Sequence, residues 1–257
     1  MLTFIGLGLY DENSITVEGQ RTLRSADDVF AEFYTSRLVG ATVEDLESHH
    51  DVSIDVRDRA GVEQEPGPIL DAAEQGDAAF LTAGDTMIST THVDLRLRAH
   101  ERGIETRVVH APTAETAASS LTGLQNYRFG KATTLPFPWA HGGDGVPGSV
   151  VDTIEDNRDR GLHTLVYLDI KAAEGEYMNA GTAAELLSEH WDGEALGVVV
   201  ARAGSPDPFV GADRLEALAE FDFGEPLHLL VIPGDLHHIE ADALGELAGA
   251  AAELLDE

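Results

Sequence analysis

The sequence predicts an α/β protein made of two α/β halves. Strand patterns alternate with helical patterns along the first half of the 257 residues, and this alternation is typical of parallel β-α-β units. The length suits one large domain or two small ones, and 43% hydrophobic content supports a globular core. We expect domains at 1–111 and 112–257. The cleft between two such domains is the default ligand site.

The first half shows five strand patterns and four helical patterns. Residues 29–34 alternate apolar side chains in and out, as a strand does, and residues 16–26 place apolar side chains at helical spacing. Pro68 suits the first turn of a helix. We expect strands at 2–5, 29–34, 52–54, 78–82 and 104–110, and helices at 16–26, 43–47, 69–74 and 89–102.

The second half begins with a helix rich in alanine and serine. Its strand patterns are continuous apolar runs, which are typical of buried strands. We expect strands at 131–135, 161–170, 195–201 and 226–232. We expect helices at 113–122, 149–160, 182–190, 212–221 and 239–255, the last of them amphipathic.

Residues 81–92 carry the densest set of candidate ligand groups. Gly84, Asp85 and several hydroxyl side chains follow the expected strand 78–82. Glycine permits strained backbone angles and close approach of a ligand, and ligands of open α/β sheets bind beyond the carboxyl ends of the strands. The stretch is a candidate ligand loop. The alternative is a capped turn with a solvent-facing acid.

The chain is strongly acidic, with 47 Asp and Glu against 16 Lys and Arg and a net charge of −31. The acids are spread over the whole sequence, so we interpret the charge as adaptation to high salt, where self-repulsion is screened. Clustered basic residues are missing, and we expect no direct nucleic-acid binding. The absence of cysteine excludes disulfides, thiolate metal sites and a cysteine nucleophile.

The first ten residues lack the basic start of a signal peptide and are expected to form a core strand. No apolar run approaches the length of a membrane span. We therefore expect a cytoplasmic protein without membrane association.

The common catalytic motifs are missing or incomplete. Gly6 and Gly8 follow the first strand, but Asp11 stands where a dinucleotide fingerprint has its third glycine. There is no G-x-S-x-G elbow, no phosphate-loop lysine motif and no H-E-x-x-H pair, and we expect no metal site. His92 and His110 are candidates for buried polar groups. His228 lies inside an apolar strand, where a histidine bonded to backbone is usual.

The order of segments resembles the diphthine synthases, archaeal methyltransferases of the tetrapyrrole-methylase class. The resemblance covers almost the whole chain, and the blocks Ala-Glu-Phe-Tyr-Thr-Ser at 31–36 and Leu-Asp-Ile-Lys-Ala at 168–172 are specific to this branch. Further matching blocks lie at 4–12, 29–30, 84–85, 90–92, 110–112, 122–124, 129–131, 161–164, 201–205 and 233–237.

This resemblance implies two α/β domains, a homodimer, and S-adenosyl-L-methionine bound in the cleft between the domains. It also implies that the enzyme trimethylates the amino group of the 3-amino-3-carboxypropyl histidine of elongation factor 2. The products are diphthine and S-adenosyl-L-homocysteine, and the reaction is one step of diphthamide synthesis. Carried over by motif, the cofactor contacts are Leu9, Asp85, Ile88, Thr113, Ala114, Leu168, Ala203 and His228.

The sequence departs from the family pattern at Ala83 and Thr86, where the family usually has prolines. The ligand loop has therefore lost two fixed φ angles, which is expected to make it less stiff. Gly84 and Asp85 remain, so we expect the site to survive.

The chemistry needs no catalytic triad, because the sulfonium already activates the methyl group and orientation carries much of the rate. The substrate ammonium must first lose its proton to a carboxylate or to water, and no general base is identified. Asp85 is expected to bind the cofactor, and His228 to hydrogen-bond near the adenine. The alternatives are a methylase of a tetrapyrrole or of ribosomal RNA, and a nucleotide-binding module without turnover.

The acidic composition makes a prediction about salt. Mutual repulsion of the surface carboxylates is screened at molar salt and grows as salt is removed, so the melting temperature should fall between molar and millimolar KCl. A thermal unfolding series by circular dichroism measures this. An unchanged melting temperature would contradict the interpretation of the charge.

Overall fold

The computed structural model describes residues 1–143, 145–191 and 195–255. The chain divides into two compact units, of which the first comprises 1–113 with 172–174 and the second 114–171 with 175–257. Each unit has its own five-stranded sheet. We describe each unit by itself.

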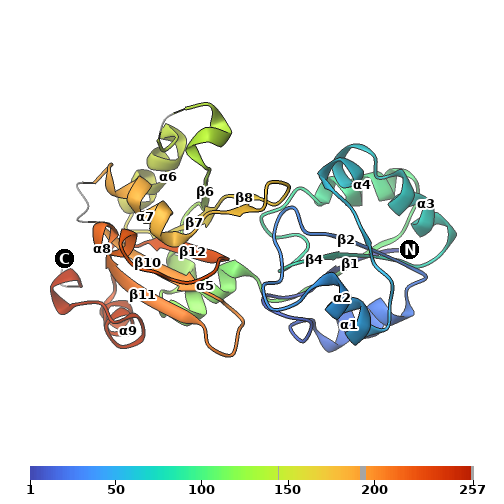
Figure 1. Ribbon diagram of the computed structural model, residues 1–257, viewed down its shortest axis with the longest axis horizontal. Coiled ribbons are helices and arrows are strands. Elements are labelled where there is room, and N and C mark those ends of the chain that lie inside the picture. Colours follow the sequence, from blue (N-terminus) through green and yellow to red (C-terminus); the bar gives the residue numbers. More distant parts are fainter. Residues whose placement is uncertain (144, 192–194, 256–257) are drawn as a thin grey trace. The chain divides into compact units, whose positions relative to one another are not determined.

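The sheet of the first unit is fully parallel, in the order β3 (Asp55–Val56), β2 (Asp28–Glu32), β4 (Ala78–Thr82), β1 (Leu2–Gly6) and β5 (Thr106–Val109). Helices α3 (Gly67–Gln75) and α4 (Val93–Glu101) lie on one face, and α1 (Val17–Ser25) and α2 (Val43–His50) lie on the other (Figure 1). A short π-helix at Ala60–Gln64 joins the α3 side.

The alternation of side chains along β1 and β4 fills both faces of this sheet. Phe4 and Phe80 are register partners and pack edge to face toward α3 and α4. The next pair, Ile5 and Leu81, points toward α1 and α2. All four side chains are fully buried. A strand covered on both faces reads as a continuous apolar run, which is why these two strands were recognisable in the sequence.

The sheet of the second unit is mixed, in the order β11 (Phe209–Arg214), β10 (Leu196–Ala201), β12 (His228–Ile232), β7 (Thr164–Leu168) and β6 (Thr133–Leu135). Only β6 and β7 pair in parallel among these strands. A two-stranded hairpin of β8 (Ile170–Lys171) and β9 (Glu176–Tyr177) follows β7.

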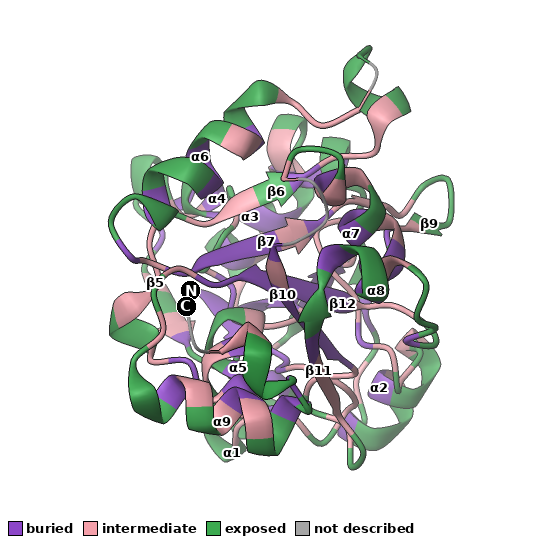
Figure 2. Cartoon of the chain, turned by 90° about the vertical axis from the view of Figure 1, so that its left-hand side faces the viewer, coloured by how far each residue is buried: buried purple, intermediate pink, exposed green. Residues whose placement is uncertain are grey.

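Helices cover both faces of the second sheet as well. Figure 2 shows the buried strands β7, β10 and β12 in purple and helices with green outer surfaces around them. One face packs against α6 (Gly148–Arg158), α7 (Ala180–Ser188) and α8 (Leu215–Ala219). The other packs against α5 (Ala114–Thr122) and α9 (His238–Ala248). Short 3-10 turns lie at Asn126–Arg128, Pro138–His141 and Ala252–Leu254.

The predicted α/β class is confirmed, whereas several predicted elements are wrong in extent or type. Residues 52–54 form no strand, because the pairing with β2 begins at Asp55. The helix predicted from residue 89 begins at Val93, since Ser89 has a φ of 53° that a helix cannot include. The helix predicted to reach 255 ends at Ala248, where Gly249 adopts the left-handed conformation with a φ of 68°.

The fourth error is β11, which replaces the first part of the helix predicted at 212–221. Its residues pair antiparallel with β10, as in Ala212 opposite Val198, and the helix begins only at Leu215. Gly211 and the exposed Asp213 interrupt the apolar alternation, so the strand pattern was not visible. The strand predicted at 161–170 is likewise shorter and ends at Leu168 before the β8–β9 hairpin.

Within the described residues, no helix combines the length and the apolar character that a membrane crossing requires.

A fully buried carboxylate, Glu240, anchors the start of α9. Its oxygens accept hydrogen bonds from the backbone N–H groups of Gln125 and His237 at 2.9 and 2.8 Å. Oε1 also lies 3.1 Å from Nε2 of His163. Arg128 Nε lies 3.6 Å from Oε2. Burial alone raises the pKa of Glu240, but these bonds outweigh it and hold the pKa below its usual range.

Glu240→Ala should destabilise the protein by about 3 kcal/mol, because it leaves buried donors of His163 and two backbone groups without an acceptor. Urea unfolding in molar salt measures the loss. Glu246→Ala is the matched control on the exposed side of the same helix. Equal stability of both variants would contradict the anchoring role.

The folding stability of the protein should fall in acid because four histidines are buried. Burial lowers the pKa of His50, His92, His163 and His228. The unfolded chain takes up protons near pH 6.5 while the folded chain does not. Stability is therefore complete above about pH 6.5 and is lost as the pH falls below it. The melting temperature at constant salt should be lower at pH 5.5 than at pH 7.5, and a higher value at pH 5.5 would contradict this assignment.

Candidate functional site

Three loops meet at the carboxyl edge of the first sheet. Strands β4, β1 and β5 are neighbours, so the segments that follow them emerge side by side. Gly8 and Gly84 pair backbone to backbone, with the N–H of Gly84 donating to the carbonyl of Gly8 at 2.7 Å and the reverse bond at 3.3 Å. This isolated antiparallel bridge joins the segments that follow β1 and β4 and places Leu9 beside the 84–88 loop.

The carboxylate of Asp85 ties this loop to the end of β5. Its Oδ1 accepts the backbone N–H of Met87 at 3.0 Å. Its Oδ2 accepts one hydrogen bond from Nδ1 of His110 at 2.8 Å and another from the backbone N–H of Ala111 at 3.2 Å. The Asp85 side chain is 4% exposed, whereas the His110 side chain is 77% exposed. The carboxylate is therefore used within the protein, and the solvent-facing alternative is wrong.

A second buried acid, Glu32, ends the neighbouring strand β2. Its Oε2 accepts the backbone N–H groups of Tyr34 and Thr35 at 3.0 Å each, and its Oε1 accepts the Thr35 hydroxyl. Oε1 also lies 3.3 Å from Nε2 of His92, and neither side chain is more than 1% exposed. The other ring nitrogen of His92 donates to the carbonyl of Thr86 at 3.2 Å. The two acids hold the 84–88 loop from both sides.

The second sheet brings together Leu168, Ala203 and His228 at one edge. Ala201 is the register partner of His228, and Leu229 pairs with Tyr167, so Leu168 lies one position beyond, next to His228. Ala203 follows the end of β10 by two residues. Leu168, His228 and Ala201 therefore lie along one line across β7, β12 and β10, and Ala203 follows in the segment after β10.

The ring of His228 is fully engaged with backbone groups. Its Nδ1 accepts the N–H of Ala180 at 3.1 Å, and its Nε2 donates to the carbonyl of Glu225 at 3.0 Å. This confirms the interpretation of His228 as a core histidine bonded to backbone. Both ring nitrogens are occupied, so the ring has no nitrogen left for the predicted hydrogen bond to an adenine. A hydrogen bond from this residue to a ligand would have to come from its backbone.

The family of Tetrapyrrole (Corrin/Porphyrin) Methylases matches residues 1–219. A curated relative named diphthine synthase from Halorubrum lacusprofundi is 73% identical and covers 100% of both chains. Another from Halobacterium salinarum is 72% identical and covers 99% of this chain and all of the relative. The chain belongs to the diphthine synthase family of tetrapyrrole methylases.

A solved structure gives the same result for the fold. A crystal structure of diphthine synthase superposes with a TM-score of 0.91 at 37% identity and covers 99% of this chain and 98% of that chain. Halophilic organisms occur among the relatives, in line with the acidic composition. The family and the fold class expected from the sequence motifs are therefore confirmed.

The remaining predicted contact residues of the diphthine synthase pattern lie at the same two edges. Ile88 is 42% exposed at the end of the 84–88 loop. Thr113 is buried two residues after Ala111, and Ala114 begins helix α5. His92 is buried, which confirms its interpretation as a buried polar group. The same interpretation of His110 is wrong, because its side chain is exposed. Glu32 was not recognised as a site residue, because nothing in the sequence distinguishes the few buried carboxylates among 47 acids.

The small residues of these loops serve two different purposes. A side chain at Gly6 would collide with the carbonyl of Gly84 at 2.5 Å, and one at Gly8 would lie 2.5 Å from Ser14. These two glycines allow protein segments to pack closely and leave no ligand space. Gly84 differs, because it has a φ of 72° and a side chain there would meet no atom within 4 Å. The open face of the edge is therefore over Gly84.

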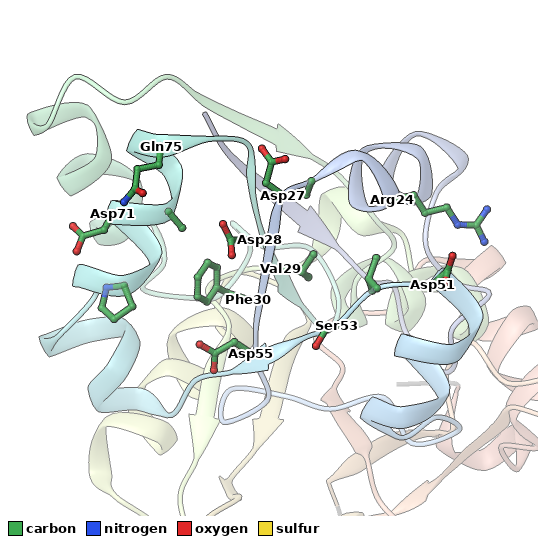
Figure 3. A pocket seen from close by; sticks show the side chains of 14 residues that line it. Arg24, Asp27, Asp28, Val29, Phe30, Asp51, Ser53, Asp55, Asp71 and Gln75 are labelled. Atoms are coloured by element: carbon green, nitrogen blue, oxygen red, sulfur yellow. The ribbon is translucent and has the colours of Figure 1, made fainter.

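An acidic cavity of about 660 Å³ lies elsewhere in the first unit (Figure 3). Asp28 and Asp55 on its wall are the first residues of β2 and β3, so the cavity is at the amino ends of the strands. Its other charged lining residues are Arg24, Asp27, Asp51 and Asp71. Ligands of open α/β sheets bind at the carboxyl ends, and we do not assign this cavity to the site. Among the described residues, no cluster of three or more potential ligands could hold a metal ion.

Asp85→Ala should lower stability by about 2 kcal/mol, because it removes the acceptor of three hydrogen bonds at a nearly buried position. Asp85→Asn keeps one acceptor oxygen and should lose less. Urea unfolding of the two variants measures this order. The reverse order would contradict the role of the carboxylate in holding the loop.

Proposed function

We propose that this protein trimethylates the amino group of the 3-amino-3-carboxypropyl histidine of elongation factor 2, with S-adenosyl-L-methionine as the methyl donor. The observation that carries the proposal is the full-length match at 73% identity to a relative named diphthine synthase. The protein would act in the cytoplasm as a homodimer, with elongation factor 2 as its protein substrate.

Two groups of residues, one in each unit, are the proposed cofactor contacts. In the first unit they are Leu9, Asp85, Ile88 and Thr113, and in the second unit Ala114, Leu168, Ala203 and His228. The open space over Gly84 fits a ligand that lies against backbone. Because the carboxylate of Asp85 and the ring of His228 are engaged within the protein, these two residues would bind through their backbone groups.

When bound, the cofactor supplies a methyl group activated by its sulfonium. The protein would have to hold the substrate amine in line with the carbon–sulfur bond of that methyl group. A loop fixed by three hydrogen bonds that the Asp85 carboxylate accepts is suited to this task, because a rigid contact loses little entropy on binding.

The proposal is tested by intact mass measurement. The protein is incubated in high salt with S-adenosylmethionine and elongation factor 2 that carries the 3-amino-3-carboxypropyl histidine. A gain of three methyl masses on the factor is the expected result. A single added methyl would keep the reaction and overturn trimethylation. No gain, with cofactor binding shown by calorimetry, would overturn the proposed substrate.

A further inference from the structure

A buried glutamate–histidine pair lies behind the 84–88 loop, away from the proposed ligand contacts. Glu32 and His92 lie 3.3 Å apart, on β2 and at the start of α4, and 60 residues separate them in sequence. Burying two ionisable side chains is costly unless each is paired and hydrogen-bonded. The contacts of the pair therefore indicate what it does.

The proton positions follow from the donors and acceptors. The Thr86 carbonyl can only accept, so Nδ1 of His92 carries the proton of that 3.2 Å bond. Nε2 of His92 lies 3.3 Å from Glu32 Oε1, but this contact lacks hydrogen-bond geometry, and Nε2 has no hydrogen-bond partner among the described residues. Burial raises the pKa of Glu32 and lowers that of His92, so it favours the neutral form of both side chains.

This arrangement connects the end of β2 to the ligand loop. Backbone N–H groups of Tyr34 and Thr35 fix the Glu32 carboxyl, the carboxyl fixes the His92 ring, and the ring holds the Thr86 carbonyl. The Phe80 and Tyr34 rings pack edge to face against His92 at 5.2 and 6.4 Å and restrict its rotation. Thr86 directly follows Asp85, so the position of its carbonyl sets the direction of the loop backbone.

We propose that Glu32 and His92 are positioning residues, which hold the 84–88 loop in its ligand-binding conformation through the Thr86 carbonyl. Neither residue touches a ligand, because each is at most 1% exposed. The link to cofactor binding rests on the function proposed above, whereas the link to the loop conformation does not.

Two substitutions remove the connection and one keeps it. His92→Phe keeps a flat ring but loses the donor to Thr86. Glu32→Ala removes the partner that orients the ring. Glu32→Gln keeps an oxygen for the N–H groups of Tyr34 and Thr35 and offers an amide N–H to Nε2 of His92, so it should preserve the arrangement.

The test has two readouts. Hydrogen exchange of residues 84–89, measured by mass spectrometry without cofactor, reports the loop alone. Calorimetry with S-adenosylmethionine and steady-state methylation report binding and turnover. His92→Phe and Glu32→Ala should raise loop exchange, the cofactor Kd and the cofactor KM by about fivefold, the effect of one lost hydrogen bond. The kcat at saturating cofactor should stay near the wild-type value.

The matched control is His163→Phe in the second unit, which breaks a histidine–glutamate pair of the same kind with both side chains fully buried. It should lower the melting temperature but leave exchange of 84–89 unchanged. Glu32→Gln should match the wild type in all readouts. If His92→Phe fails to fold, the comparison of Glu32→Ala with Glu32→Gln decides.

Unchanged loop exchange in folded His92→Phe or Glu32→Ala would overturn the proposal, as would an equal rise in His163→Phe. If loop exchange rises as expected but the wild type binds no S-adenosylmethionine, the positioning role stands and the proposed cofactor is wrong. The two failures are therefore distinguishable.

Discussion

The carboxylate of Asp85 is the interaction on which the geometry of the candidate site depends. It joins the loop after β4 to the end of β5 through His110 and the N–H of Ala111, and it closes the turn of its own loop through Met87. The backbone pairing of Gly8 with Gly84 adds the end of β1. Three loops that the parallel sheet brings to one edge thereby become a single surface.

A buried carboxylate that accepts backbone N–H groups and faces a histidine occurs three times among the described residues. In the part of the chain that the structure describes, the buried acids are Glu32, Asp85 and Glu240. Each accepts two backbone N–H groups, and each faces one histidine, namely His92, His110 and His163. A chain with a charge of −31 thus uses a few of its carboxylates as internal acceptors and exposes most of the others. Two of the three lie at the edge of the first sheet, where function is proposed.

The sequence predicted the fold well where both faces of a strand are covered. Strands such as Ala78–Thr82 read as unbroken apolar runs, and the family motifs extended this to the whole architecture. The sequence-based prediction was wrong at β11, an edge strand whose apolar pattern is interrupted by Gly211 and Asp213. It was also wrong at the end of α9, which stops before Gly249. Partners such as Glu32 and His92 are 60 residues apart, and neither periodicity nor spacing shows which acid meets which histidine. The role of the Asp85 carboxylate and the identity of the two backbone partners of His228 depend on such contacts and could not be predicted.

The proposed cofactor site at the carboxyl edge of the first sheet is tested by a crystal structure of the protein grown in high salt with S-adenosylhomocysteine. The expected ligand lies against the backbone of 84–88 over Gly84, with the carboxylate of Asp85 still bonded to the N–H of Ala111. A ligand in the acidic cavity at the amino ends of β2 and β3, or one bound by the Asp85 carboxylate itself, would refute the proposed site.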